Sequence, residues 1–170
     1  MRDLRRGRSR GQGLVEFALV LPVFLAILIG MVDLGRAVWA NNSVANAARE
    51  AARYASVHGG TKSNTCPVGP PISGVTEIPT ASVSCPNPSP SKQGVRDTAT
   101  SYLVAGGTSV NVTVCYGSGC SGDTDISGAT NARGTLVTVV VASDVPMILG
   151  SFLGVGTVRV SGTSTMLVNH

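Results

Sequence analysis

The sequence predicts an α+β protein in which one long N-terminal α-helix packs on a small antiparallel β-sheet. Three observations support this prediction. Residues 14–32 form an apolar run, residues 37–55 continue it with a two-sided alanine pattern, and the C-terminal third contains valine-rich segments that alternate with polar residues. Neither the helix stripe nor a single sheet can bury its apolar face alone, so we expect the sheet to lie on the stripe.

The apolar run is long enough to cross a membrane. From Leu14 to Val32 its 19 residues include one ionisable side chain, Glu16. A helix rises ~1.5 Å per residue and a hydrocarbon core is ~30 Å thick, so the run predicts a membrane span. Residues 33–52 carry only two arginines, whereas five precede the span: Arg2, Arg5, Arg6, Arg8 and Arg10. This asymmetry predicts a cytoplasmic N-terminus and an extracytoplasmic remainder.

The helix is predicted to continue beyond the membrane. Small apolar residues recur there at steps of three and four: Ala37, Ala40, Val44, Ala48, Ala51 and Ala55. A polar set lies two residues out of phase, about 200° around a helix: Asn42, Asn46, Arg49, Arg53 and Ser56. The two stripes therefore face opposite ways, and we expect the helix to end near Val57, before Gly59-Gly60.

The remainder, residues 58–170, is predicted to form an extracytoplasmic globular domain. It begins with a proline-rich surface loop, residues 59–92, followed by a short helix between Gln93 and Ala105 that Gly106-Gly107 stops. Period-two alternation then predicts three antiparallel strands, over residues 110–115, 135–142 and 157–168.

An apolar cluster separates the last two predicted strands. It lies within residues 145–155 and contains Met147, Ile148, Leu149, Phe152 and Leu153. One interpretation is a short helix or apolar connection folded into the core. The other is an exposed patch that binds a partner or rests on a membrane. The sequence is compatible with both.

The net charge of +4 does not indicate a nucleic-acid partner. The whole excess lies in residues 1–11, and the rest of the chain carries equal numbers of basic and acidic side chains. Aromatic residues make up only 4% of the chain. A surface that combines cations with stacking aromatic rings is therefore not expected.

Four cysteines outside the membrane favour disulfide bonds over metal binding. Cys115 and Cys120 bracket a Gly/Ser segment, and Cys66 and Cys85 bracket a Pro-rich one. Of the three possible connectivities we favour these two pairs, because each closes a loop without regular structure. A zinc site is the alternative, but the spacing differs from C-x₂-C and the histidines are remote in sequence.

A carboxylate near the start of an apolar helix is costly in a plain anchor and tends to be functional. Here Glu16-Phe17 follows Arg10-Gly11, and cleavage after Gly11 would make Gln12 the first residue and Glu16 the fifth. Together with Pro22, these residues resemble type IV pilins, and specifically the TadE-like pseudopilins of tight-adherence (Flp pilus) systems. The resemblance also includes two segments farther along the helix, Asp33-Leu34-Gly35-Arg36 and Ala47-Ala48-Arg49-Glu50-Ala51-Ala52-Arg53.

The resemblance is strong over residues 10–57 and implies a pilin-like fold. It implies that a prepilin peptidase removes residues 1–11 as a cytoplasmic leader, and that residues 12–57 form the anchoring helix of a mature chain in the inner membrane. The implied partners are other pilins and pseudopilins and the inner-membrane pilus assembly platform, in addition to the lipid bilayer. No cofactor is implied.

The chemistry of Glu16 can also be argued from the residues themselves. A carboxylate within hydrocarbon is stabilised when a cation reaches it, and cleavage would create one at the amino group of Gln12. In a helical stack this amine would come from a neighbouring subunit, so the pair would set the register. The alternative is that Glu16 extends to the lipid headgroups.

Two further classes of site were considered. Asp123, Asp125 and Ser127 match part of a calcium loop, but Gly134 stands where the bidentate Glu is required, so a polar turn is the alternative. No nucleophile stands beside a base in a recognisable motif, and no catalytic residue is predicted.

Two other functions remain open from the sequence. The chain could be a signal-anchored extracytoplasmic binding or adhesion protein cut near Ala40, although its apolar run exceeds the ~7–15 residues of a signal peptide. A membrane-tethered enzyme is the third. The mature N-terminus distinguishes the first two, since a pseudopilin would begin at Gln12 and a secreted protein near Asn41.

Overall fold

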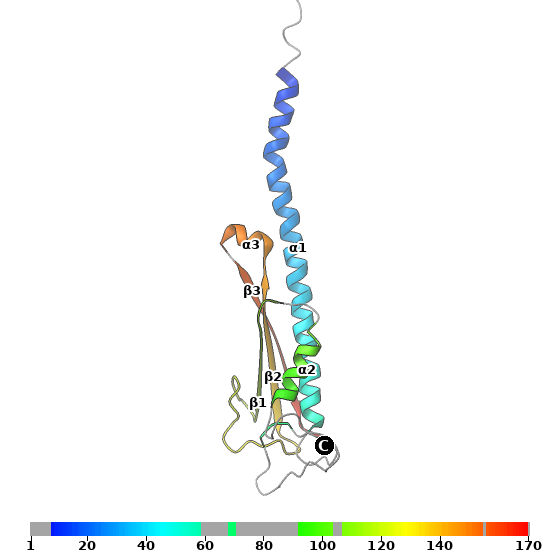
Figure 1. Cartoon of the computed structure of the whole chain (residues 1–170), viewed down its shortest axis with the longest axis vertical. Helices are drawn as coiled ribbons and strands as arrows, with labels where there is room; N and C mark the ends of the chain where they lie inside the picture. The colour runs from blue at the N-terminus through cyan, green and yellow to red at the C-terminus, as the bar shows by residue number, and fades with distance from the viewer. Residues whose placement is uncertain (1–7, 59–67, 71–91, 104–106, 155, 170) are drawn as a thin grey trace, which may run out of the picture.

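A computed structural model of the whole chain describes residues 8–58, 68–70, 92–103, 107–154 and 156–169. One long helix extends well beyond a small head made of a sheet and two short helices (Figure 1). The elements in chain order are α1 (Arg8–Val57), α2 (Gln93–Ser101), β1 (Val110–Tyr116), β2 (Leu136–Pro146), α3 (Ile148–Leu153) and β3 (Thr157–Leu167). The predicted α+β class is confirmed.

Helix α1 is a continuous helix of 50 residues with two different halves. In its N-terminal half, side chains from Leu14 to Val32 are mostly exposed around the whole circumference. This part is long and apolar enough to cross a membrane, with a mean hydropathy of 2.6 over its most apolar window. The predicted end near Val57 is also confirmed, and Pro22 lies inside the helix without ending it.

The three strands form one antiparallel sheet in the order β1-β2-β3. Their registers align Val114 with Val139 and Val139 with Ser164, so a single row of side chains crosses the sheet toward the helix. The other face of the sheet presents residues such as Thr113, Thr138 and Thr163 away from α1. One side of the sheet is thus packed and the other is open.

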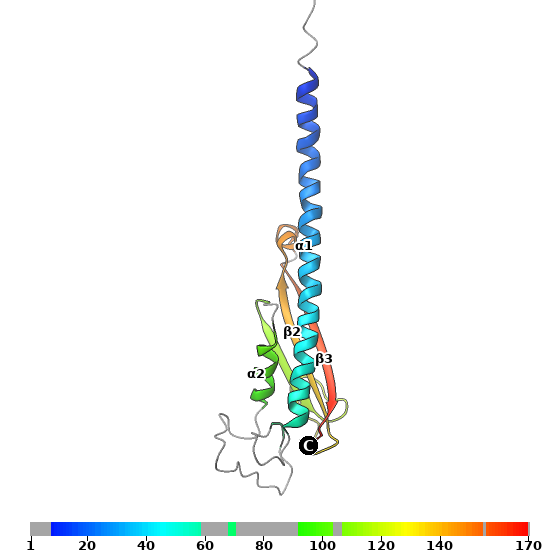
Figure 2. The ribbon, with the colours of Figure 1, turned by 90° about the vertical axis from the view of Figure 1, so that its right-hand side faces the viewer.

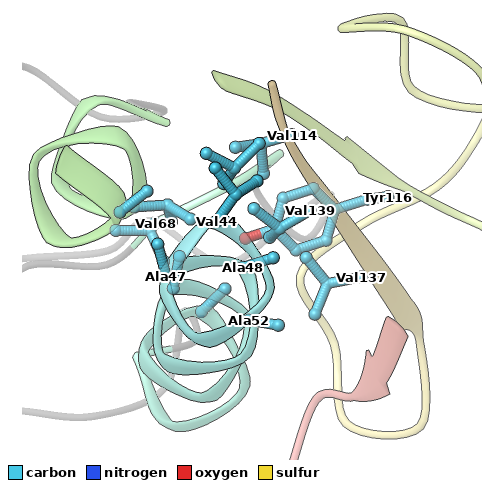
Figure 3. Packing of buried hydrophobic residues seen from close by; sticks show 14 of the residues in the cluster. Val44, Ala47, Ala48, Ala52, Val68, Val114, Tyr116, Val137 and Val139 are labelled. Carbon is cyan, nitrogen blue, oxygen red and sulfur yellow. The ribbon is translucent and has the colours of Figure 1, made fainter. Parts of the chain in front are cut away.

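The sheet lies on the alanine stripe of α1, as predicted. Small helix residues and valines of β1 and β2 meet in this layer, together with the Tyr116 ring, as Figure 3 shows from close by. The approach is close at Gly162 of β3, where a Cβ atom would lie 2.7 Å from Ala45 Cα and 2.9 Å from the carbonyl oxygen of Val44. Any side chain at this position would therefore push the sheet away from the helix.

The buried face of α1 is wider than one stripe. Helix α2 packs beside α1, at one flank of the sheet (Figure 2), and buries Val95 and Ala99 in the same core. Ala47 and Ala52 are consequently buried although they lie outside the predicted stripe. Ser56, placed in the polar stripe, is also buried, because the chain after β3 runs past it and Asn169 donates a backbone hydrogen bond to its carbonyl oxygen.

Two predicted boundaries are wrong. Helix α2 ends at Ser101, before the predicted stop at Gly106-Gly107, and Tyr102 forms its C-cap by donating its backbone N–H to carbonyls of the last turn. Strand β2 extends to Pro146, four residues beyond its predicted end, because β3 continues to pair with it as far as Thr157. A proline is tolerated there because it terminates the strand.

Candidate functional site

The predicted processing and assembly residues lie at the free end of α1, far from the head (Figure 1). Gly11 has no heavy atom within 4 Å of the position where a Cβ would stand. The side-chain amide of the next residue, Gln12, donates to Oε1 of Glu16, one turn further along the helix, at 3.5 Å. Phe17 beside it is exposed. In the described part of the chain, no residue of the head contacts this end, so its side chains are available to lipid or to other subunits.

Asp33 lies at the outer end of the apolar run and has a role that the sequence did not reveal. Its carboxylate accepts the backbone N–H of Ile148 at 3.0 Å and that of Leu149 at 2.8 Å, and it is 5% exposed. It therefore caps the first turn of α3 from a distant helix. Asp33 also pairs with Arg36 on the same helix, at a longer distance of 4.0 Å.

The apolar cluster of residues 145–155 is a short helix with partial core packing, and the exposed patch of the second interpretation is present without a test of what binds it. Met147 packs against the core, and a Leu149 methyl group lies 3.6 Å from the position of a Cβ on Gly30. Ile148 and Phe152 are instead exposed on the short helix α3. The segment is thus a short helix attached to α1 on one side and uncovered on the other.

The candidate calcium residues hold together the turn after β1. Asp123 Oδ1 accepts the N–H of Val114 and Asp125 Oδ1 accepts that of Tyr116, each at 2.8 Å. These two donors lie on the outer edge of the sheet, so the aspartates occupy hydrogen-bonding positions that another strand could take. Ser127 lies in the same turn and is exposed.

Two cations from the α2 side neutralise these aspartates. Lys92 Nζ lies 2.9 Å from Asp125 Oδ1, and the Arg96 guanidinium pairs with Asp123. Within the residues that the structure describes, no group of three His, Cys, Asp or Glu side chains could hold a metal ion. The arrangement favours a polar turn that connects α2 to the edge of the sheet.

Cys115 and Cys120 form a disulfide, with Cα atoms 6.0 Å apart. The bond closes the turn next to the Asp123 and Asp125 contacts, which fits the predicted local pairing. Cys66 and Cys85 lie outside the described residues, as does most of the Pro-rich loop. Their predicted pairing therefore stays a prediction.

Two tyrosines in the head have raised pKa values. Burial raises the pKa of the Tyr116 phenol well above its usual range, and the Asp125 carboxylate adds to the effect. The Tyr116 hydroxyl has no hydrogen-bond partner among the described atoms. Burial, and secondarily Asp97, also raises the pKa of Tyr54, whose ring stacks on His58 with centroids 3.8 Å apart.

Comparison with known proteins gives a match over the N-terminal helix. The family model described as TadE-like protein matches residues 11–53, which begin at the predicted processing glycine and run through both halves of α1. Searches of the curated proteins and of the solved structures found no match. The matched segment contains Glu16, Asp33 and most of the alanine stripe, so this part of the chain is similar to TadE-like proteins, a family related to the Tad pilus.

Proposed function

We propose that this protein is a pseudopilin, or minor pilin, that serves as a structural subunit in the assembly of Flp (tight-adherence) pili. In this proposal residues 1–11 are a cytoplasmic leader, residues 12–57 are the anchoring helix, and residues 58–170 form the extracytoplasmic domain. The observation that carries the proposal is the match of residues 11–53 to the TadE-like family on a helix whose first half is uncovered.

The division of α1 supports a role in assembly. Its C-terminal half is already covered by the head, whereas its N-terminal half exposes large apolar side chains that a bilayer or other pilin helices would cover. A subunit that leaves the bilayer for a filament must exchange lipid for protein on this surface. A uniformly apolar helix with one carboxylate is suited to both environments.

The proposed location follows from the same helix. The protein resides in the inner membrane as a single-pass protein with its N-terminus inside, and it enters an extracellular pilus on assembly. Prepilin peptidase, other pilins and pseudopilins, and the inner-membrane assembly platform are the proposed partners. The bilayer covers the exposed half of α1 before assembly.

Glu16 is the proposed assembly residue, with Phe17 beside it. After cleavage, the amino group of Gln12 on a neighbouring subunit would pair with the Glu16 carboxylate in a medium of low dielectric constant. In the uncleaved chain the Gln12 side chain already approaches this carboxylate at 3.5 Å. The head contributes no cation to it among the described residues, so we assign the cation to the Gln12 amine of a neighbouring subunit.

The assembly role is tested by the substitution Glu16→Ala in cells that produce the pilus. Insertion depends on the apolar length and the Arg flank, so the variant should be inserted and cleaved normally. An unpaired amine costs ~3–5 kcal/mol when buried, so co-purification with other pilins should fall sharply. The matched control is Glu50→Ala, which removes the carboxylate that pairs with Arg53 on the head half of α1. Normal assembly of Glu16→Ala, or blocked cleavage, would contradict the assigned role.

Processing is tested separately at Gly11. Gly11 is the assigned cleavage site because only cleavage after this glycine makes Glu16 the fifth residue. Replacing Gly11 with Leu should therefore block cleavage and leave full-length protein in the membrane. Gly13→Leu is the matched control, since Gly13 has equally open surroundings. Cleavage of Gly11→Leu at the normal site would contradict the assignment.

A further inference from the structure

We propose that the short helix α3 rests on the extracytoplasmic surface of the lipid bilayer, with Phe152 inserted among the headgroups. The inference rests on the proposed role of α1 as a membrane anchor. It concerns a different part of the chain, the connection between β2 and β3, and gives the head a second point of contact with lipid. Helix α3 stands at the end of the head that faces the uncovered half of α1 (Figure 1).

The level of α3 along α1 is fixed by three contacts. The Asp33 carboxylate binds the N–H groups of Ile148 and Leu149, and the Leu149 side chain lies against Gly30. At ~1.5 Å per residue, a hydrocarbon core of ~30 Å that begins at Leu14 ends near Asp33. Helix α3 is therefore attached to α1 where the hydrocarbon gives way to the headgroups.

The side chains of α3 suit that environment. The sequence Ile148-Leu149-Gly150-Ser151-Phe152-Leu153 contains no charge. Phe152 is 83% exposed and Ile148 is 46% exposed, an unfavourable arrangement if water covered them. An aromatic ring at the interface can insert ~5–10 Å into the boundary between headgroups and acyl chains.

The exposed apolar side chains of α3 lie near the level of exposed apolar side chains on α1. Beyond the span, Leu34, Val38 and Trp39 of α1 are exposed as well, so apolar side chains gather on both helices near this level. Asp33 satisfies two N–H groups of the first turn of α3, and an unpaired donor would be costly beside hydrocarbon. The level of α3, at the outer end of the apolar run, favours lipid over a protein partner as the occupant.

The experiment places a single tryptophan in the full-length protein. Trp39, the only tryptophan in the chain, is first replaced by Phe. Phe152→Trp is then compared with Phe24→Trp in the span and with Ile126→Trp as a matched control. Ile126 is 42% exposed and binds Tyr116 through its backbone, at the end of the sheet opposite α3. Each variant is reconstituted into vesicles of phosphatidylcholine and phosphatidylglycerol. The lipid acyl chains carry bromine atoms, which quench tryptophan emission, either near the headgroup (shallow) or near the end of the acyl chain (deep).

We expect Phe152→Trp to lose most of its emission with the shallow bromines and much less with the deep ones. Its maximum should be shifted to the blue relative to that of Ile126→Trp, which should remain unquenched. If Phe24→Trp is quenched and Phe152→Trp behaves like Ile126→Trp, then the anchoring role of α1 is supported and the inference about α3 is wrong. The same result is expected if a protein partner covers α3. If Phe24→Trp is also unquenched, the anchoring role fails and the inference fails with it.

Discussion

The two halves of α1 differ in what covers them, although both are rich in small and aliphatic residues. Residues 14–32 carry large apolar side chains exposed around the helix, whereas residues 40–55 present alanines and Val44 to the sheet and to α2. Large side chains maximise the area offered to lipid, and small ones allow backbones to approach closely. One continuous helix thus has one half suited to lipid or a filament and another suited to its own head.

The largest loss of stability is expected at Gly162, where the packed half of α1 lies close to the sheet. Gly162→Val should destabilise the head by about 3 kcal/mol, because the new Cβ would meet the backbone of Ala45 and no change of rotamer could relieve the overlap. The free energy of unfolding can be measured by chemical denaturation of the full chain in detergent micelles. Gly156→Ala is the control, since no heavy atom lies within 4 Å of its Cβ position. An equal effect of both substitutions would show that the close approach is unimportant.

A valine in each half of α1 gives the most direct comparison. Val44→Ala removes two fully buried methyl groups and should cost about 2 kcal/mol of head stability, including the cavity it leaves. Val23→Ala, at a position 60% exposed on the same helix, should leave the denaturation midpoint of the head unchanged. If Val23→Ala lowered the midpoint as much as Val44→Ala, the two halves would not be energetically independent.

A smaller effect is expected at the boundary between the halves. Asp33→Ala should cost about 1–2 kcal/mol, because two N–H donors of α3 lose their acceptor. Hydrogen exchange of the Ile148 and Leu149 amides should accelerate, while amides in β2 keep their protection. Asp33→Asn retains one carbonyl acceptor and should give an intermediate rate. Unchanged exchange in Asp33→Ala would contradict the capping role.

The smallest effect at neutral pH is expected for Tyr116→Phe, because the buried hydroxyl that it removes has no described hydrogen-bond partner. The difference should appear at alkaline pH. The folded-state pKa of Tyr116 is raised above the unfolded value of 10.0, so its contribution is fully present below pH 10 and is lost as pH rises above that value. Stability measured against pH should therefore decline less steeply in Tyr116→Phe. Tyr54 should retain part of the decline, since its pKa is raised too.

The elements that could be predicted from the sequence are those with a regular period. The apolar run, the alanine stripe and the three Val-rich segments each repeat with the spacing of one structure, so α1, the antiparallel sheet and their packing were predicted. Burial of Ala47 and Ala52 was missed because it depends on where α2 lies, which no pattern within α1 encodes. The end of α2 at Ser101 was missed because the glycine signal lies several residues beyond it.

The interactions that could not be predicted join residues far apart in the chain. Asp33 contacts Ile148 across 115 residues, and Lys92 reaches Asp125 only because α2 lies beside the edge of the sheet. In the sequence, Arg36 lies three residues after Asp33, a spacing that indicates a local ion pair and gives no sign of the contact with α3. The aspartates at 123 and 125 resembled the start of a calcium loop because alternating carboxylates serve either a cation or, as here, alternate N–H groups of a strand edge.

The central proposal, that this chain with its TadE-like helix is a processed pilus subunit, is tested most directly by sequencing the N-terminus of the protein extracted from membranes. The account predicts that the mature chain begins at Gln12, with Glu16 as its fifth residue. A chain that begins at Met1 or Arg2 would indicate an uncut anchor, and one that begins near Asn41 would indicate a secreted protein. Either result would contradict the account.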